Sequence, residues 1–221
     1  KTPSSTRTRV TTWQSTSPTS SPTSSQPARL LRPPDPSVTS PPLTMTLEKT
    51  IRAGRKRPLF TPQPETTHEV SLDVAAVERM LPHREPMRLV DGISLVDFEQ
   101  GCVRGFLNVK EDDPVFAGHF PGDPVYPGVL LLEAIGQLGI CLQHLLSTRR
   151  LEVDERDAPR RVRLLKVTHA MFQGAVRPGE KVDLIAKSLE ESDYVSSCAG
   201  QVIVGDDIRA LAVYEVFNLE E

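Results

Sequence analysis

The strongest constraint on the fold is an apolar segment between Val129 and Leu146, in the second half of the 221-residue chain. A helix over these residues would be apolar on nearly all sides, which is typical of a buried helix. Pro127 lies where such a helix could begin, because the first turn has no partner for the N–H that proline lacks. The segment is too short, and too often interrupted by polar residues, to span a membrane. We therefore predict a central helix enclosed by the rest of the domain.

Shorter apolar patterns around this segment indicate strands. Alternating or clustered branched residues predict an antiparallel hairpin over residues 88–97 and 101–109. The segment DVAAVERML, residues 73–81, is expected to form a short helix with apolar positions along it. Asp73 can cap the start of this helix. Four further strands are expected at about 161–172, 181–189, 194–204 and 208–217. One buried helix beside about six antiparallel strands implies an α+β domain whose sheet curls around the helix.

Two glycines within the predicted helix, Gly136 and Gly139, require an explanation. Glycine lowers the stability of a helix, so we expect another backbone to approach closely at both positions.

A histidine and a glutamate stand out against the apolar background. His119 lies in a Gly- and Pro-rich loop before the helix, Glu133 lies inside the helix, and Gln137 lies one turn further on the same face. Burial should raise the pKa of the Glu133 carboxyl, whereas a loop histidine can accept a proton near neutral pH. Such a pair beside an apolar cavity could remove a proton and expel a hydroxyl. Taken singly, His119 could be a structural histidine and Glu133 could pair with an arginine.

The same stretch carries a family resemblance. GHFPGDPVYPGVLLLEAIGQ, residues 118–137, resembles the active-site segment of the FabZ-type 3-hydroxyacyl-acyl-carrier-protein dehydratases. LPHREPMRLVDGI (81–93) and HAMFQGAVRPGEKVDL (169–184) are similar to further segments of that family, and the resemblance extends over about residues 70–217. Asp123 is a departure that the sister FabA type shares, but the FabA type has Asp where this chain has Glu133.

The resemblance implies the hotdog fold and a hydro-lyase of fatty acid biosynthesis. The implied reaction removes water reversibly from a (3R)-3-hydroxyacyl chain on acyl carrier protein and gives a trans-2-enoyl thioester. It implies catalytic roles for His119 as base and Glu133 as acid, without a cofactor or a metal. The residues expected to bind substrate are Phe120, Gly128, Val129 and Gln137. His83 also matches a family position, and we expect a structural role for it.

The resemblance further implies a homodimer, or a trimer of dimers, in which the His and Glu of one site come from different subunits. Four apolar residues of the loop would form an exposed patch in a monomer, which supports dimerisation: Phe116, Phe120, Val125 and Tyr126. With a net charge of −3, the chain gives no general reason to expect a nucleic acid as partner, and no membrane partner is expected.

Three alternatives remain open at this point. The same chemistry could serve a polyketide or other specialised pathway. A hotdog thioesterase would instead hydrolyse the thioester, but normally lacks the GHFPxxPxxPGV loop. A non-catalytic acyl-thioester binding subunit would be expected to lose His119 or Glu133, and both are present.

The first part of the chain has a different composition. Residues 1–69 are expected to be a disordered leader and linker, followed by the hotdog domain at 70–221. Residues 1–44 are rich in Ser, Thr and Pro, with arginines but almost no acids, so a transit peptide, a linker and a misplaced start are all open. The basic run RAGRKR (52–57) is expected to be a solvated tail. Three widely separated cysteines suit a reducing compartment, so a cytoplasmic location is expected, or an organellar one if a transit peptide is present.

Overall fold

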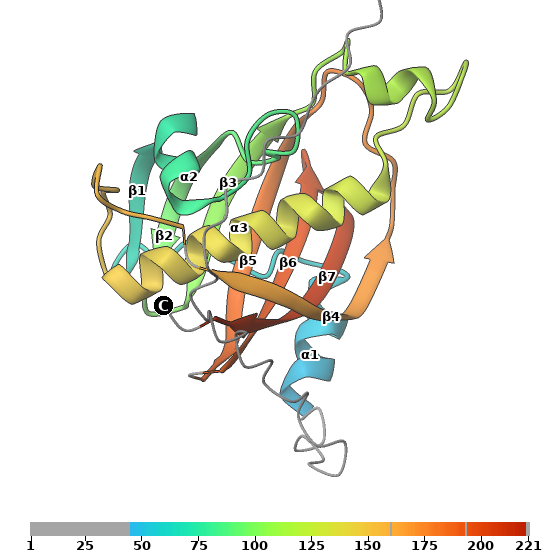
Figure 1. Cartoon of the computed structure of the whole chain (residues 1–221). Coiled ribbons are helices and arrows are strands. Elements are labelled where there is room, and N and C mark those ends of the chain that lie inside the picture. The colour runs from blue at the N-terminus through green and yellow to red at the C-terminus, as the bar shows by residue number, and fades with distance from the viewer. Residues whose placement is uncertain (1–44, 160, 193, 220–221) are drawn as a thin grey trace, which may run out of the picture. The chain divides into compact units, whose positions relative to one another are not determined.

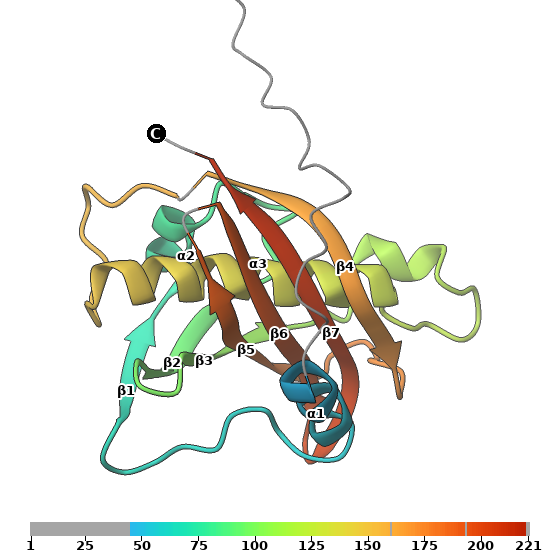
Figure 2. The same cartoon turned by 90° about the horizontal axis from the view of Figure 1, so that it is seen from below.

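Helix α3, Gly128–Thr148, lies across one face of a seven-stranded antiparallel sheet (Figures 1 and 2). The structure is a computed structural model that describes residues 45–159, 161–192 and 194–219. Leu131, Leu138 and Leu142 of α3 are among the core residues buried against the sheet. By length and composition α3 could cross a membrane, but 61% of its most apolar stretch is buried inside the fold. The predicted central helix is confirmed.

The sheet has the strand order β1-β2-β3-β5-β6-β7-β4, so β1 and β4 form its two edges. The strands are β1 (Thr67–Leu72), β2 (Gly92–Asp97), β3 (Cys102–Asn108), β4 (Val162–Phe172), β5 (Lys181–Glu191), β6 (Val195–Val204) and β7 (Asp207–Asn218). The predicted hairpin and the four later strands are present, and β1 is an additional strand. A long helix against one curved antiparallel sheet is the predicted hotdog arrangement.

Two short helices lie in the segments before α3. Helix α2, Val74–Met80, begins after Asp73, whose carboxylate accepts a hydrogen bond of 3.0 Å from the N–H of Ala76. The predicted cap is therefore present. A 3-10 helix, Pro114–Ala117, leads into the loop that carries His119.

Residues 45–66 form a segment that we call the strap. It consists of helix α1 (Met45–Gly54) and the chain that connects this helix to β1. Gln201 of β6 fixes the strap: its amide donates to the carbonyls of Gly54 and Arg57 at 2.5 and 3.1 Å and accepts from the N–H of Leu59 at 2.7 Å. Phe60 adds an apolar contact, because it is buried with Cys102, Ile185 and Ile203.

The strap covers the face of the sheet opposite α3. A Cβ on Gly200 would collide with Ile135 of α3, so position 200 faces the helix. Side chains alternate between the two faces of a strand, so Gln201 faces the other side, where it contacts the strap. Figure 2 shows α1 on this outer face.

Asp97, at the end of β2, holds the end of the strap. Its buried carboxylate accepts hydrogen bonds from the hydroxyls of Thr66 and Thr67 and from the backbone and side-chain N–H groups of Gln100. Burial alone raises the pKa of Asp97, but these hydrogen bonds outweigh it and lower the pKa to about 2.

The strap changes the expectation for the first part of the chain. The described residues belong to one compact unit, Pro41–Glu221, so the expected boundary near residue 70 falls within β1 and inside this unit. The basic run 52–57 is not a solvated tail, since it ends a helix whose backbone is bonded to Gln201. The expectation for residues 1–44 lies outside the described residues.

Candidate active site

A cavity of about 340 Å³ runs along α3. Its wall is mostly apolar, and its polar groups come from Glu133, Gln137, Gln143, His83 and Tyr214. The apolar lining residues are Val129, Leu132, Ile135, Ile140, Val162, Leu164, Val167, Cys198 and Val216, together with Gly136 and Gly139. An apolar cavity with a few polar groups is typical of a site for a small hydrophobic ligand.

The two helix glycines leave space in this cavity. A Cβ on Gly136 would meet nothing within 4 Å, and one on Gly139 would only reach Cys198 Sγ at 3.4 Å. The prediction that another backbone approaches both glycines is therefore wrong. Their missing side chains instead widen the cavity, at a half-buried position for Gly136 and at a buried position facing Cys198 for Gly139.

Glu133 and Gln137 lie one turn apart, as expected from their spacing. Gln137 is fully buried, and its amide donates to Glu133 Oε1 at 2.9 Å and to the carbonyl of Met87 at 2.7 Å, while its Oε1 accepts from the N–H of Leu89 at 2.8 Å. The Glu133 side chain is 39% exposed in the single subunit, so the expectation of a buried carboxyl is wrong for one chain alone. The helix face that carries it is open to the cavity.

His83 is a site residue that the sequence did not assign to the site. Its Nε2 lies 3.4 Å from Glu133 Oε1, and it lines the cavity. Its Nδ1 is buried without a hydrogen-bond partner among the described residues. The expectation of a purely structural role is not supported by this contact. The only sequence signal was its match to a family position 50 residues before Glu133.

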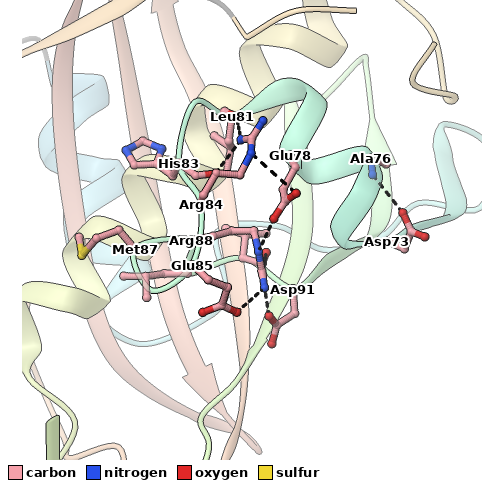
Figure 3. A network of polar contacts seen from close by, with 12 residues as sticks. Asp73, Ala76, Glu78, Leu81, His83, Arg84, Glu85, Met87, Arg88 and Asp91 are labelled. Carbon is pink, nitrogen blue, oxygen red and sulfur yellow. Dashed lines mark hydrogen bonds and ion pairs between the residues drawn. The ribbon is translucent and has the colours of Figure 1, made fainter. Parts of the chain in front are cut away.

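The loop that carries His83 is held by Arg88. The guanidinium of this buried arginine lies 3.3 Å from Glu78, 2.8 Å from Glu85 and 2.8 Å from Asp91, and it also donates to the carbonyl of Val90 (Figure 3). Burial lowers the pKa of Arg88, but the hydrogen bond and charge of Asp91, with the charges of Glu85 and Glu78, raise it above its usual value. The predicted strand at 88–97 begins only at Gly92, because the backbone before it has other partners: the N–H of Arg88 donates to the carbonyl of Arg84, that of Leu89 donates to Gln137, and the carbonyl of Val90 accepts from the Arg88 side chain.

His119 is half-buried, and its Nδ1 lies 2.7 Å from the carbonyl oxygen of Val125. A carbonyl can only accept, so Nδ1 carries the hydrogen and Nε2 of the neutral ring is left able to accept a proton. The ring stacks on the exposed ring of Phe120 with centroids 3.9 Å apart, and the peptide bond between the two residues is cis.

The first residues of α3 present free N–H groups. Pro127 is the N-cap, and the N–H groups of Gly128 and Val129 have no hydrogen-bond partner among the described residues. The free N–H groups and the helix dipole favour negative charge at this end of α3. The Val129 side chain is 70% exposed, which is unusual for a residue of an apolar helix.

One chain does not bring His119 and Glu133, the residues predicted to be base and acid, together in its cavity. Glu133 lines the cavity, whereas His119 is not among its lining residues. The expected apolar patch also differs, because Phe116 and Tyr126 are buried and only Phe120 is strongly exposed. Other large apolar residues are exposed at the start of α3 and on the edge strand β4: Val129, Leu164, Leu165 and Val167.

The remaining polar groups do not suggest another kind of site. Among the described residues, no group of three or more His, Cys, Asp or Glu side chains could hold a metal ion. The three thiols are free, and burial raises the pKa of Cys102 to about 11 and that of Cys198 to about 12. Such thiols are poor nucleophiles. The Tyr214 hydroxyl is used to donate to the carbonyl of Leu132, one residue before Glu133.

Comparisons with known proteins agree with this geometry. The profile of the FabA-like domain matches residues 81–213. A FabZ 3-hydroxyacyl-[acyl-carrier-protein] dehydratase of Nitratiruptor sp. is 35% identical over 142 residues, which are 64% of this chain and 93% of that protein. The enzyme of the same name from Caulobacter vibrioides is 33% identical over 156 residues, 71% of this chain and 94% of the relative.

A solved structure shares the fold. The dehydratase heterocomplex ApeI:P from Xenorhabdus doucetiae superposes with a TM-score of 0.51 at 19% identity, over 66% of this chain and 91% of that chain. The profile match, the similarity to full-length relatives and the helix-in-sheet architecture lead to one assignment. The chain belongs to the FabA-like family and, within it, to the FabZ-type 3-hydroxyacyl-[acyl-carrier-protein] dehydratases.

Proposed function

We propose that this protein is a (3R)-3-hydroxyacyl-[acyl-carrier-protein] dehydratase of fatty acid biosynthesis. The observation that carries the proposal is the Glu133 carboxyl at a polar point of an otherwise apolar cavity. An acyl chain can occupy the apolar part, and the carboxyl can meet its 3-hydroxyl. The family assignment supplies the substrate class.

In the proposed mechanism His119 is the base. Its Nε2 takes the proton from C2 of the substrate, because Nδ1–H is committed to the carbonyl of Val125. The electron pair of the broken C2–H bond forms the C2=C3 double bond. The bond between C3 and its oxygen breaks, and Glu133 donates the proton with which the hydroxyl leaves as water.

Glu133 is oriented for this step by its neighbours. Its Oε1 accepts from Gln137 and lies near His83, while Oε2 has no hydrogen-bond partner in the described part of the chain. In this proposal Oε2 is the oxygen that donates the proton to the substrate hydroxyl. The free N–H of Gly128 would polarise the thioester carbonyl, and Phe120 would supply a second backbone contact.

The active unit is proposed to be a homodimer, with a trimer of dimers as the larger assembly. Leu164 on the edge strand β4 is 59% exposed, and Val129, which lines the same cavity, is 70% exposed. A two-fold partner would cover this surface and would bring His119 of one subunit to Glu133 of the other. Three free thiols support a reducing compartment, for which we propose the cytoplasm.

The deciding experiment incubates the full chain with 3-hydroxybutyryl carrier protein and follows enoyl absorbance and free thiol together. A dehydratase produces enoyl thioester without thiol. Thiol without enoyl product would refute the proposal and would indicate a thioesterase.

The residue roles are tested separately. His119→Ala and Glu133→Gln should each lower kcat by about 10²–10⁴-fold, since a general acid or base contributes that much. The matched control is His68→Ala on β1, outside the cavity, which should leave kcat unchanged. Near-normal turnover in either site variant would remove that residue from the mechanism.

A further inference from the structure

The strap carries a surface that the family profile does not include. The profile match begins at residue 81, whereas α1 and the following turn lie at residues 45–58. Five exposed cations project from this part of the strap: Lys49, Arg52, Arg55, Lys56 and Arg57. We call these five residues the basic platform.

The basic platform is not neutralised by its own chain. Among the described residues, none of the five forms an ion pair with a carboxylate. Other exposed arginines do pair, such as Arg149 with Glu99 and Arg177 with Asp123. Residues 48–57 contain one acid, Glu48, so the local net charge is +4 in a chain whose net charge is −3.

The platform is held rigidly by its backbone rather than by its charged side chains. The carbonyls of Gly54 and Arg57 accept from Gln201, and the carbonyl of Arg55 accepts from the side chain of Gln173 at 3.1 Å. The cationic heads therefore remain free to contact another molecule, on a support fixed to the sheet.

The platform lies close to the start of the catalytic helix. Gln173, which contacts Arg55, directly follows Phe172. The Phe172 ring lies where a Cβ on Gly128 would be, with ring atoms only 2.7–3.1 Å from that position. Gly128 is the residue proposed to polarise the thioester carbonyl. Three residues, Gln173, Phe172 and Gly128, therefore connect the platform to the position proposed for the thioester.

We propose that the basic platform is a docking surface for an acidic face of the carrier protein that presents the acyl thioester. This inference rests on the proposed function and adds a binding surface outside the residues that the family profile matches. Guanidinium groups bind carboxylates in a bidentate manner, and a field of unpaired cations accelerates encounter with an acidic partner. Residues 45–59 contain no aromatic side chain on which a base could stack, which disfavours single-stranded nucleic acid.

The test is the charge reversal Arg52→Glu/Arg55→Glu/Lys56→Glu in the full chain, assayed with two substrates. One is 3-hydroxybutyryl carrier protein, and the other is 3-hydroxybutyryl-N-acetylcysteamine, which has no protein surface. We expect the KM for the carrier-linked substrate to rise about 10-fold or more at low salt, with kcat unchanged. We expect kcat/KM for the small thioester to be unchanged.

A matched control reverses three exposed cations near the other end of α3, namely Arg149→Glu/Arg150→Glu/Arg156→Glu. That end lies about 30 Å from Gly128 along a 21-residue helix, so the control should leave the KM for carrier protein near its wild-type value. An equal rise in KM in the control would overturn the proposal, because it would reflect overall charge.

Two measurements remain informative if the reversed variant folds poorly. The wild-type KM for carrier protein should rise with salt while that for the small thioester does not, and a salt-independent KM would contradict the docking. The milder variant Arg52→Gln/Arg55→Gln/Lys56→Gln should shift the carrier KM in the same direction.

Failure of the proposed function gives a different result. In that case the wild type would form no enoyl product from either substrate, and direct binding of the carrier protein by fluorescence anisotropy would test the platform. Carrier binding that is equal in wild type and variant would overturn the docking. Binding of a single-stranded RNA that the reversal abolishes, with no effect on carrier protein, would assign the platform to nucleic acid instead.

Discussion

Gln137→Leu tests whether Gln137 positions the carboxyl of Glu133, which we propose to be catalytic, in addition to stabilising the fold. Gln137 is fully buried and makes hydrogen bonds to the backbone of Met87 and Leu89 and to the carboxyl of Glu133. Leucine has a similar volume but offers no hydrogen bond. The substitution therefore leaves the buried N–H of Leu89 without a partner and releases Glu133 Oε1.

The expected cost follows from these contacts. An unsatisfied buried N–H costs about 1–3 kcal/mol, and the lost bond to the partly exposed carbonyl of Met87 costs about 0.5–1.5 kcal/mol. Burial of the leucine offsets a part of this sum. We expect the free energy of unfolding to fall by about 1–4 kcal/mol. We expect kcat to fall by about 10-fold or more, because Glu133 is no longer held toward the substrate.

The matched control is Gln201→Leu. Gln201 is also fully buried and also bonds backbone groups, but it lies on the outer face of the sheet beneath the strap. Its loss should lower the free energy of unfolding by a similar amount, about 1–4 kcal/mol. Its kcat with 3-hydroxybutyryl-N-acetylcysteamine should remain near that of the wild type.

Urea unfolding gives the stability of each variant, and enoyl absorbance with the small thioester gives kcat. A Gln137→Leu variant that is destabilised but retains kcat within about twofold would refute the positioning role. An equal fall of kcat in Gln201→Leu would show that both changes act through general loss of stability.

Three further outcomes are expected. Mixing inactive His119→Ala with inactive Glu133→Gln should restore activity if subunits exchange, because a mixed dimer contains one intact site; proven mixed dimers without activity would exclude a shared site. His83→Ala should lower kcat and alter the pH profile of kcat, since Nε2 lies 3.4 Å from Glu133, and an unchanged profile would assign His83 to packing. Asp97→Asn should reduce stability at neutral pH by about 2 kcal/mol, since the folded pKa is about 2 against an ordinary 3.8. A carboxyl whose folded pKa is lowered stabilises the fold at pH values above its ordinary pKa. The difference in unfolding free energy between wild type and Asp97→Asn should therefore vanish as the pH falls from 3.8 toward 2. A difference that stays constant in urea unfolding over this pH range would contradict the prediction.

The sequence alone determined the elements with strong local patterns. The apolar run after Pro127 gave the position of α3 to within two residues at each end, because a helix that is apolar all round must be buried. Asp73 marked the start of α2, since a cap acts on the residues that follow it directly. The spacing of Glu133 and Gln137 predicted their contact, because residues four apart meet on one helix face.

Only the tertiary structure revealed contacts between distant segments. His83 approaches Glu133 because the Arg88 network folds its loop against α3, and no local pattern encodes that approach. The polar, basic composition of the strap gave no local signal that it packs on the sheet. Its backbone is bound by Gln201, which lies 142 residues after Leu59 in the sequence.

The exposure of one face of α3 was likewise visible only in the tertiary structure. Hydrophobicity predicted that all sides of α3 are covered, but the sheet of one chain covers only one side and leaves Val129 and the cavity exposed. Sequence periodicity shows which residues avoid water, whereas the arrangement of the strands decides which surface covers them. For this reason the candidate residues could be named from the sequence, while their division between the cavity and a separate loop required the fold.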